Sequence, residues 1–264
     1  MQNIRKMNIN IIHSPTKEKP FLVINKPKGL ASAPLSKDDK NNALSQSIEL
    51  FPELCTVHGK KEIEYGLLHR LDTATDGLIV IAATQECYDF LCEEQREGRF
   101  IKYYTADCNY NPVNAKLLGG FPPSDISIQD ALLDKTYTIS SYFRPYGEGR
   151  KEVRPVTEKS GKAALSKLGK QKQYTTNIKI ISNDISQKKL SVECCITEGY
   201  RHQVRCHLAW AGLPVSGDTL YNSSCRSISE GIKKAENLLF SATKISFEYP
   251  RGDLNSYDRK DTWT

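Results

Sequence analysis

The chain has 264 residues, of which 39% are hydrophobic, and its formal net charge is +6. This length allows one large domain or two unequal lobes, and we find neither the ~18-residue apolar run of a membrane-spanning helix nor a signal-peptide core at the start. The eight cysteines form no C-x-x-C pair, which favours thiols in a reducing cytoplasm over a disulfide framework.

The first hundred residues predict alternating strands and helices. Residues 21–25 (FLVIN) form a β-prone run that ends at the Pro and Gly of KPKG, and 43–51 have rough helical spacing. Residues 64–69 (EYGLLH) and 78–83 (LIVIAA) predict two strands joined by a polar turn. A helix is expected over 85–97, with a threonine at its N-cap and a glycine after its end.

Strands dominate the remainder of the chain. The segments 100–108, 174–181, 190–197 and 243–249 are β-rich, and 202–212 predicts a helix closed by glycine and proline. Strands outnumber helices and several follow one another as hairpins would. We therefore predict an α+β fold whose mixed, mainly antiparallel central sheet is flanked by helices.

The positive charge is concentrated in one segment. Residues 144–172 contain nine Lys or Arg and three Asp or Glu, a net charge of +6, so the rest of the chain is neutral on balance. A solvated basic loop is the ordinary interpretation of such a run. The functional interpretation is a surface that faces phosphates, because basic groups release condensed counterions from nucleic acid.

Two polar clusters interrupt the apolar pattern. The stretch YGLLHRLDTATDGLIVIAA (65–83) places Arg70, Asp72 and Asp76 on a connection between apolar runs, where they form either a salt-bridged turn or a reactive site. The stretch EGYRHQVRCHL (198–208) leads through a glycine into a helix and carries cationic and amide groups. It is either a polar helix start or an anion-binding site.

Taken in order, five motifs resemble the RluA-type pseudouridine synthases, a family that isomerises uridine to pseudouridine in ribosomal or transfer RNA. The motifs are FLVINKPKGLASAP, HRLDTATDGLIVIA, IKYYTA, EGYRHQVRCHLAWAGLPVSGDTLY and LLFSATKISFEYP, spread over roughly residues 20–250. The resemblance implies the pseudouridine synthase fold with an RNA-binding cleft. It also implies a catalytic domain over 21–250, an N-terminal extension over 1–20 too short for an S4-type RNA-binding module, and a polar tail over 251–264 with little to bury.

The resemblance implies three catalytic residues. Asp72 matches the essential aspartate that starts breakage of the N-glycosidic bond, by attack at C1′ or by action at C2′. Positive charge that develops on the sugar explains the need for a carboxylate. Arg205 matches the arginine that pairs with this aspartate, and an adjacent cation favours the ionised carboxylate. Tyr104 matches the active-site tyrosine that stacks on the uracil, although a core tyrosine would be the ordinary interpretation of this position alone.

The resemblance also assigns RNA contacts. A uridine inside folded RNA must be flipped out, and Arg70 matches the arginine implicated in this step. Lys26, His202 and Gln203 are further candidates for contact with RNA. The basic segment is our candidate for reaching phosphates, a hypothesis that fails if charge reversal at Lys162, Lys167 and Lys170 leaves RNA affinity and its salt dependence unchanged. We expect RNA as the partner, no membrane, no metal or other cofactor, a monomer, and a cytoplasmic location.

The sequence departs from the family pattern at a few positions. Asp76 stands where the family has serine and adds negative charge near Asp72, and Tyr200 and Arg201 replace Arg-Thr before HQIR. Two alternatives remain open: a non-catalytic RNA-binding protein on the same scaffold, and a glycoside hydrolase pairing Asp72 with Asp76 or Asp218. The intact Asp72, Tyr104 and Arg205 argue against the first alternative. The second is disfavoured because the sequence shows no second acid in a comparable setting.

Overall fold

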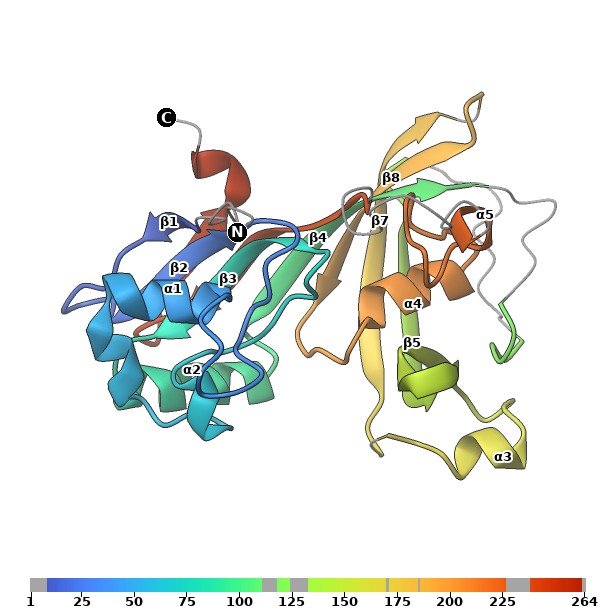
Figure 1. Ribbon diagram of the computed structural model, residues 1–264. Coiled ribbons are helices and arrows are strands. Elements are labelled where there is room, and N and C mark those ends of the chain that lie inside the picture. Colours follow the sequence, from blue (N-terminus) through green and yellow to red (C-terminus); the bar gives the residue numbers. More distant parts are fainter. Residues whose placement is uncertain are drawn as a thin grey trace, which may run out of the picture. The chain divides into compact units, whose positions relative to one another are not determined.

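The computed structural model describes residues 9–110, 118–123, 133–169, 171–184, 186–226 and 238–262. The chain forms two compact units (Figure 1), the first from residues 1–102 and 241–264 and the second from 103–240. The division falls inside two strands, β4 (Ile101–Asn109) and β9 (Phe240–Glu248). Each unit combines a sheet with helices, and the predicted α+β class is confirmed.

The sheet of the first unit is mixed. Besides β9 it contains β1 (Asn10–His13), β2 (Phe21–Lys26), β3 (Asp76–Ala82) and β10 (Leu254–Asp258). Strand β2 pairs antiparallel with β1 and β3, β3 pairs parallel with β9, and β9 pairs antiparallel with β10. All seven residues of β3 are buried, so this strand has no solvent-exposed face. It provides a rigid anchor for the loop that precedes it.

Helices cover this sheet. They are α1 (Ala43–Leu50) and α2 (Gln85–Arg96), with short 3-10 turns η1 (Pro52–Thr56), η2 (Glu62–Glu64) and η4 (Arg259–Thr262). The Thr84 side chain accepts from the Cys87 N–H (3.2 Å) at the start of α2, and Gly98 follows its end with a φ of +74°, as the sequence predicted. Cys87 and Leu91 pack with Phe21 and its neighbours in the core of the sheet.

Two local predictions for the first unit are wrong. Residues 64–69 do not form a strand: Tyr65 has a φ of +43°, and the segment meets β3 through a single bridge between Leu67 and Ile81. The segment after residue 250 is not without burial. Its residues form β10, in which Asn255 is 3% exposed, and Tyr257 packs on the core. This polar stretch is too short for an alternating apolar pattern to indicate a strand, so its pairing with β9 was not predictable from the sequence.

The sheet of the second unit is built from long hairpins. After β4 it contains β5 (Thr136–Tyr146), β6 (Glu152–Val156), β7 (Tyr174–Asp184) and β8 (Lys189–Ile196), in the order β4-β8-β7-β5-β6. Strand β7 pairs antiparallel with β8 and β5, and β5 pairs antiparallel with β6. These pairings account for the predominantly antiparallel character that the sequence predicted.

One helix fills the core of the second unit. Its helices are α3 (Lys162–Leu165), α4 (Gln203–Trp210) and α5 (Ser223–Arg226), with the 3-10 turn η3 (Glu148–Arg150). Every residue of α4 is buried, and Cys206 and Ala209 pack against Phe143, Val153 and Tyr174. A helix buried all round fixes its polar side chains as firmly as its apolar ones. Within the described ranges, no helix is long and apolar enough to cross a membrane.

Candidate active site

Asp72 lies on the loop that enters β3. Its side chain is half-buried, and its carbonyl accepts from the Thr75 N–H (3.0 Å), which closes a tight turn. The loop ends at Asp76, the first residue of the fully buried β3. The carboxylate predicted to be catalytic is therefore carried by a short turn on a rigid strand.

The loop that follows β2 holds the main chain on both sides of Asp72. The Ser32 hydroxyl donates to the Leu71 carbonyl (2.7 Å) and accepts from the Leu71 N–H (2.9 Å). The Gly29 N–H donates to the Thr73 carbonyl (2.7 Å), and Gly29 has a φ of +83°, which favours glycine. The KPKG segment and its neighbours thus serve as a frame for the HRLD segment.

Lys26 completes this frame from inside the protein. Its side chain is fully buried, and Nζ donates to the carbonyls of Leu30 (2.7 Å) and Pro27 (3.0 Å) and lies 3.5 Å from that of Thr73. Burial lowers the pKa of Lys26 to about 8, opposed by the charges of Asp76 and then Asp72. The prediction that Lys26 contacts RNA does not fit this burial, because the ammonium group would have to leave these carbonyls.

Asp76 ends the loop among cationic and hydroxyl groups. It is 6% exposed; Oδ1 accepts from the Ser241 hydroxyl (2.7 Å) and lies 4.0 Å from Lys28 Nζ, and Oδ2 lies 2.6 Å from Arg259 Nη1. Sequence reasoning identified Asp76 as a departure from the family but missed these partners. Ser241 and Arg259 stand more than 160 positions away along the chain, and no motif connects them to Asp76.

The two residues before Leu71 differ in environment. The His69 ring accepts from the Val80 N–H (3.3 Å) and lies against Phe100, and burial lowers its pKa, so the ring is neutral near pH 7. Arg70 is exposed, and its Nη1 lies 3.1 Å from Glu64 Oε1. His69 thus belongs to the framework, whereas Arg70 presents its guanidinium to solvent.

Tyr104, predicted to stack on uracil, lies on β4 in the second unit. Burial alternates along this strand, so that Tyr104 is 7% exposed and its neighbour Tyr103 is half-buried on the other face. The Tyr104 ring is stacked on Phe240, with centroids 5.2 Å apart and planes 7° apart. An aromatic ring is therefore already in contact with one of its faces.

Arg205 lies on α4 and is paired with a carboxylate that the sequence analysis gave another role. Its Nε and Nη2 donate to the two oxygens of Asp218 (2.8 and 2.9 Å), and both side chains are buried. Asp218 also accepts from the N–H groups of Leu220 and Tyr221. The GDTLY stretch quoted in the resemblance contains Asp218, so the signal was present, but its partner was not predictable from spacing.

The remaining predicted contacts, His202 and Gln203, begin α4. The Gln203 amide donates to the Thr175 carbonyl (2.9 Å) and accepts from the Tyr200 N–H (2.9 Å), and the residue is 2% exposed, which does not fit a direct RNA contact. His202 is half-buried with a φ of +56°, and its Nδ1 lies 3.0 Å from the Tyr221 hydroxyl.

The structure therefore brings the predicted site residues together in two groups. Asp72, Arg70 and Lys26 gather in the first unit, and Tyr104, Arg205, His202 and Gln203 belong to the second. The pairing of Asp72 with Arg205 joins the two units and stays a prediction. Among the described residues, no three His, Cys, Asp or Glu side chains are placed to hold a metal ion.

The basic segment divides into a structural part and a surface part. Arg154 is 1% exposed, lies 2.6 Å from Glu152 and has its guanidinium 4.1 Å from the Tyr146 ring centroid, so it belongs to the core. Lys162 and Lys167 are exposed on and beside α3. Lys170 lies outside the described residues.

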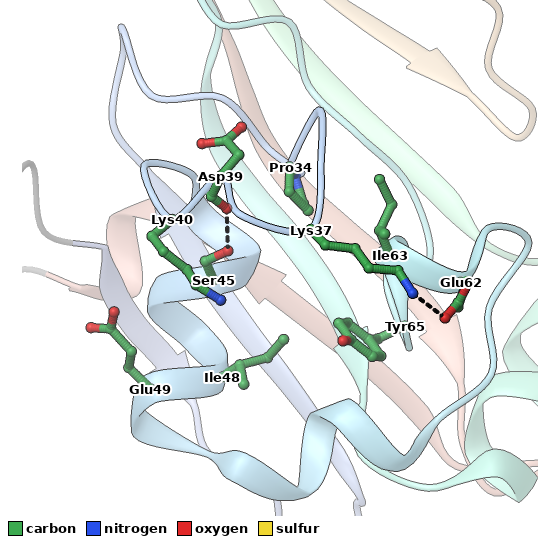
Figure 2. A pocket seen from close by; sticks show the side chains of 10 residues that line it. All are labelled: Pro34, Lys37, Asp39, Lys40, Ser45, Ile48, Glu49, Glu62, Ile63 and Tyr65. Carbon is green, nitrogen blue, oxygen red and sulfur yellow. Dashed lines mark hydrogen bonds and ion pairs between the residues drawn. The ribbon is translucent and has the colours of Figure 1, made fainter.

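A separate cavity of about 280 Å³ lies in the first unit beside α1 (Figure 2). Lys37 and Glu62 form an ion pair among the residues that line it (2.7 Å), and Tyr65 lies on the same side of the labelled group. None of the predicted site residues lines this cavity, so it is not the predicted uridine site.

Comparisons with known proteins give the chain a context. Residues 20–210 match the family described as RNA pseudouridylate synthase. Ribosomal large subunit pseudouridine synthase D of Neisseria meningitidis is 25% identical over 90% of this chain and 54% of its own length. The tRNA pseudouridine(31) synthase of Saccharomyces cerevisiae is 25% identical over 82% and 48%. The chain thus spans about half the length of these curated relatives.

A solved structure supports the fold. Human RNA Pseudouridylate Synthase Domain Containing 1 superposes with a TM-score of 0.62 at 18% identity, over 98% of this chain and 85% of that one. Human RNA Pseudouridylate Synthase Domain Containing 4 gives a TM-score of 0.59. The match to the fold covers both units, including the segments beyond residue 210.

Proposed function

Because the chain belongs to the RNA pseudouridylate synthase family, we propose that it isomerises uridine to pseudouridine in ribosomal or transfer RNA. The observation that carries this proposal is the frame around Asp72: a half-buried carboxylate whose main chain is fixed on both sides by Ser32 and Gly29. Such preorganisation is what a group acting on a developing sugar cation needs.

In the proposed reaction, Asp72 starts the breakage of the bond between C1′ and N1 of uridine. The detached uracil rotates and bonds to C1′ through C5, the proton at C5 is lost to solvent, and N1, which no longer bonds to the sugar, takes up a proton from solvent. Atoms balance without an added reactant, because the product is an isomer of the substrate. The proposal therefore includes no cofactor.

Arg205 and Tyr104 complete the proposed chemistry. Arg205 pairs with Asp72, while Asp218 engages its Nε and Nη2 in a bidentate contact. The Asp218 pair keeps the guanidinium plane fixed. Tyr104 stacks on uracil, and the Phe240 ring behind it holds its plane in place.

RNA binding in this proposal rests on exposed cations. Arg70 takes the place of the flipped uridine in the base stack, which its exposed guanidinium allows. Lys162 and Lys167 contact phosphates, because both are exposed, the first on α3 and the second just after it. The protein acts in the cytoplasm as a monomer.

Tritium release tests the reaction. RNA labelled with tritium at uracil C5 should lose tritium to water on incubation with the protein, and Asp72→Asn should reduce the rate by about 1000-fold or more. Asp89→Asn is the matched control, because Asp89 is exposed on α2, and it should retain the wild-type rate. RNA binding without any tritium release would replace the proposal with the non-catalytic alternative.

A salt titration tests the phosphate contacts. The Lys162→Glu/Lys167→Glu variant should bind single-stranded RNA more weakly, and the slope of log K against log salt should fall by about 0.7 for each lost phosphate contact. Lys17→Glu/Lys60→Glu is the control, because both lysines are exposed in the first unit. Equal slopes in the two variants would remove the basic segment from the interface.

A further inference from the structure

The C-terminal segment reaches the loop that carries Asp72. Strand β10 runs antiparallel to β9, with Asp258 opposite Lys244, so the next residue continues toward the start of β9. Ser241, at that start, is the parallel partner of Asp76 on β3. The topology therefore delivers Arg259 to the end of the Asp72 loop, where its Nη1 lies 2.6 Å from Asp76 Oδ2.

The contact is built rather than incidental. Asp76 is 6% exposed and Arg259 is 33% exposed in its side chain, so the pair is largely removed from water and screened little by salt. Tyr257 anchors the segment just before it by packing on the core that contains Phe21 and Phe247. The neighbouring position 77 must be glycine, since a Cβ there would lie 2.1 Å from the Ala242 carbonyl oxygen, so β3 and β9 approach closely beside this pair.

The charges explain why such a clamp is needed. An aspartate at position 76, where the resembled family has serine, places a second carboxylate four residues after Asp72 at the other end of one turn. A nearly buried carboxylate requires a compensating partner. Lys28, 4.0 Å away, is a more distant cation than Arg259, and Ser241 contributes a hydroxyl without charge.

We propose that Arg259 is a positioning residue for Asp72, acting through Asp76: it neutralises Asp76 and fixes the end of the catalytic loop. This inference rests on the proposed function for its effect on turnover, but the ordering of the loop stands independently of it.

Turnover of the single and double variants tests the proposal. Arg259→Gln should lower kcat for tritium release about 10- to 100-fold with little change in KM, because the loop is disturbed and RNA binding is not. Asp76→Ser/Arg259→Gln should return kcat to within about threefold of the wild type. Both charged residues are then replaced, so neither Asp76 nor Arg259 is left without the other. Arg251→Gln, an exposed arginine of the same segment, is the control and should be unchanged.

A second readout does not depend on catalysis. Hydrogen exchange of the amides at 72–76, including the Thr75 N–H that bonds to Asp72, should be faster in Arg259→Gln by about 10-fold and restored in the double variant. If the wild type releases no tritium but this exchange pattern holds, the proposed function fails and the clamp stands. Wild-type exchange in Arg259→Gln, or a raised KM that the double variant does not rescue, would overturn the proposal.

Discussion

The loop over residues 69–76 and the helix α4 hold their candidate residues by opposite means. The loop is fixed by side chains and amides from two remote segments, residues 26–32 and the C-terminal segment with Arg259. Helix α4 is buried on every side, and Arg205 finds its partner only 13 residues further along. A loop can place a carboxylate at a surface where substrate arrives, but its geometry depends on contacts that the local sequence does not contain.

The largest effect should come from the buried ion pair in the second unit. Asp218→Ala leaves the Arg205 guanidinium buried without its bidentate partner and should lower the free energy of unfolding by about 3–5 kcal/mol. Asp134→Ala removes the exposed pair with Lys179 and should cost less than about 1 kcal/mol. Urea denaturation measures both. Equal effects would contradict the contrast between buried and exposed pairs.

The buried Lys26 in the first unit predicts a contribution to the free energy of unfolding that depends on pH. Its pKa is about 8 in the folded protein against 10.5 ordinarily, so between these values the unfolded chain binds more protons and rising pH stabilises the fold. The unfolding free energy of the wild type minus that of Lys26→Met should rise by about 3 kcal/mol from pH 8 to 10.5. A difference that stays flat across this window would show that burial does not depress the pKa of Lys26.

His207 on α4 predicts how stability changes on the acid side of neutral pH. Burial lowers its pKa to about 3, while Nε2 contacts the Ser141 hydroxyl and Nδ1 the Thr176 hydroxyl, each at 2.9 Å. Below pH 6.5 the unfolded chain binds the extra proton, so acid destabilises the fold. From pH 6.5 to 5 the wild type should lose about 2 kcal/mol more than His207→Gln. Parallel losses in the two proteins would assign the acid limb to other groups.

The smallest effect concerns how the helices begin. Thr84 caps α2 through its hydroxyl, whereas His202 at the start of α4 makes no side-chain cap bond. Thr84→Ala should therefore lower the free energy of unfolding by about 1 kcal/mol. Thermal denaturation measures it, and an unchanged midpoint would mean that packing of Cys87 and Leu91 alone maintains the helix.

The same contrast explains what the sequence could predict. Helix α2 with its cap, the apolar strand β3 and the hairpin β7–β8 were predictable, because each is encoded by spacing and turn residues within a few positions. The family motifs identified Asp72 as a candidate, and the structure shows that the KPKG segment contacts the segment that carries it. That much depends on contiguous residues.

The missed features join residues that are distant in sequence. From its sequence alone, β10 looks like a polar tail, and it becomes a strand by pairing with β9. Arg259 reaches Asp76 only through that pairing. Burial of Lys26 was likewise not predicted, since a lysine at the end of a strand is ordinarily solvated. Asp218 lay in a quoted motif, but only folding of α4 shows which cation it meets.

The first unit is discontinuous, which has a consequence for synthesis. Residues 1–102 are translated before the second unit, whereas strands β9 and β10 are translated only after it. Until β9 has been added, β3 lacks its parallel neighbour, and until residue 259 has been added, Asp76 lacks Arg259. The loop that carries Asp72 therefore gains its last contacts only after the residues that follow the second unit have been translated.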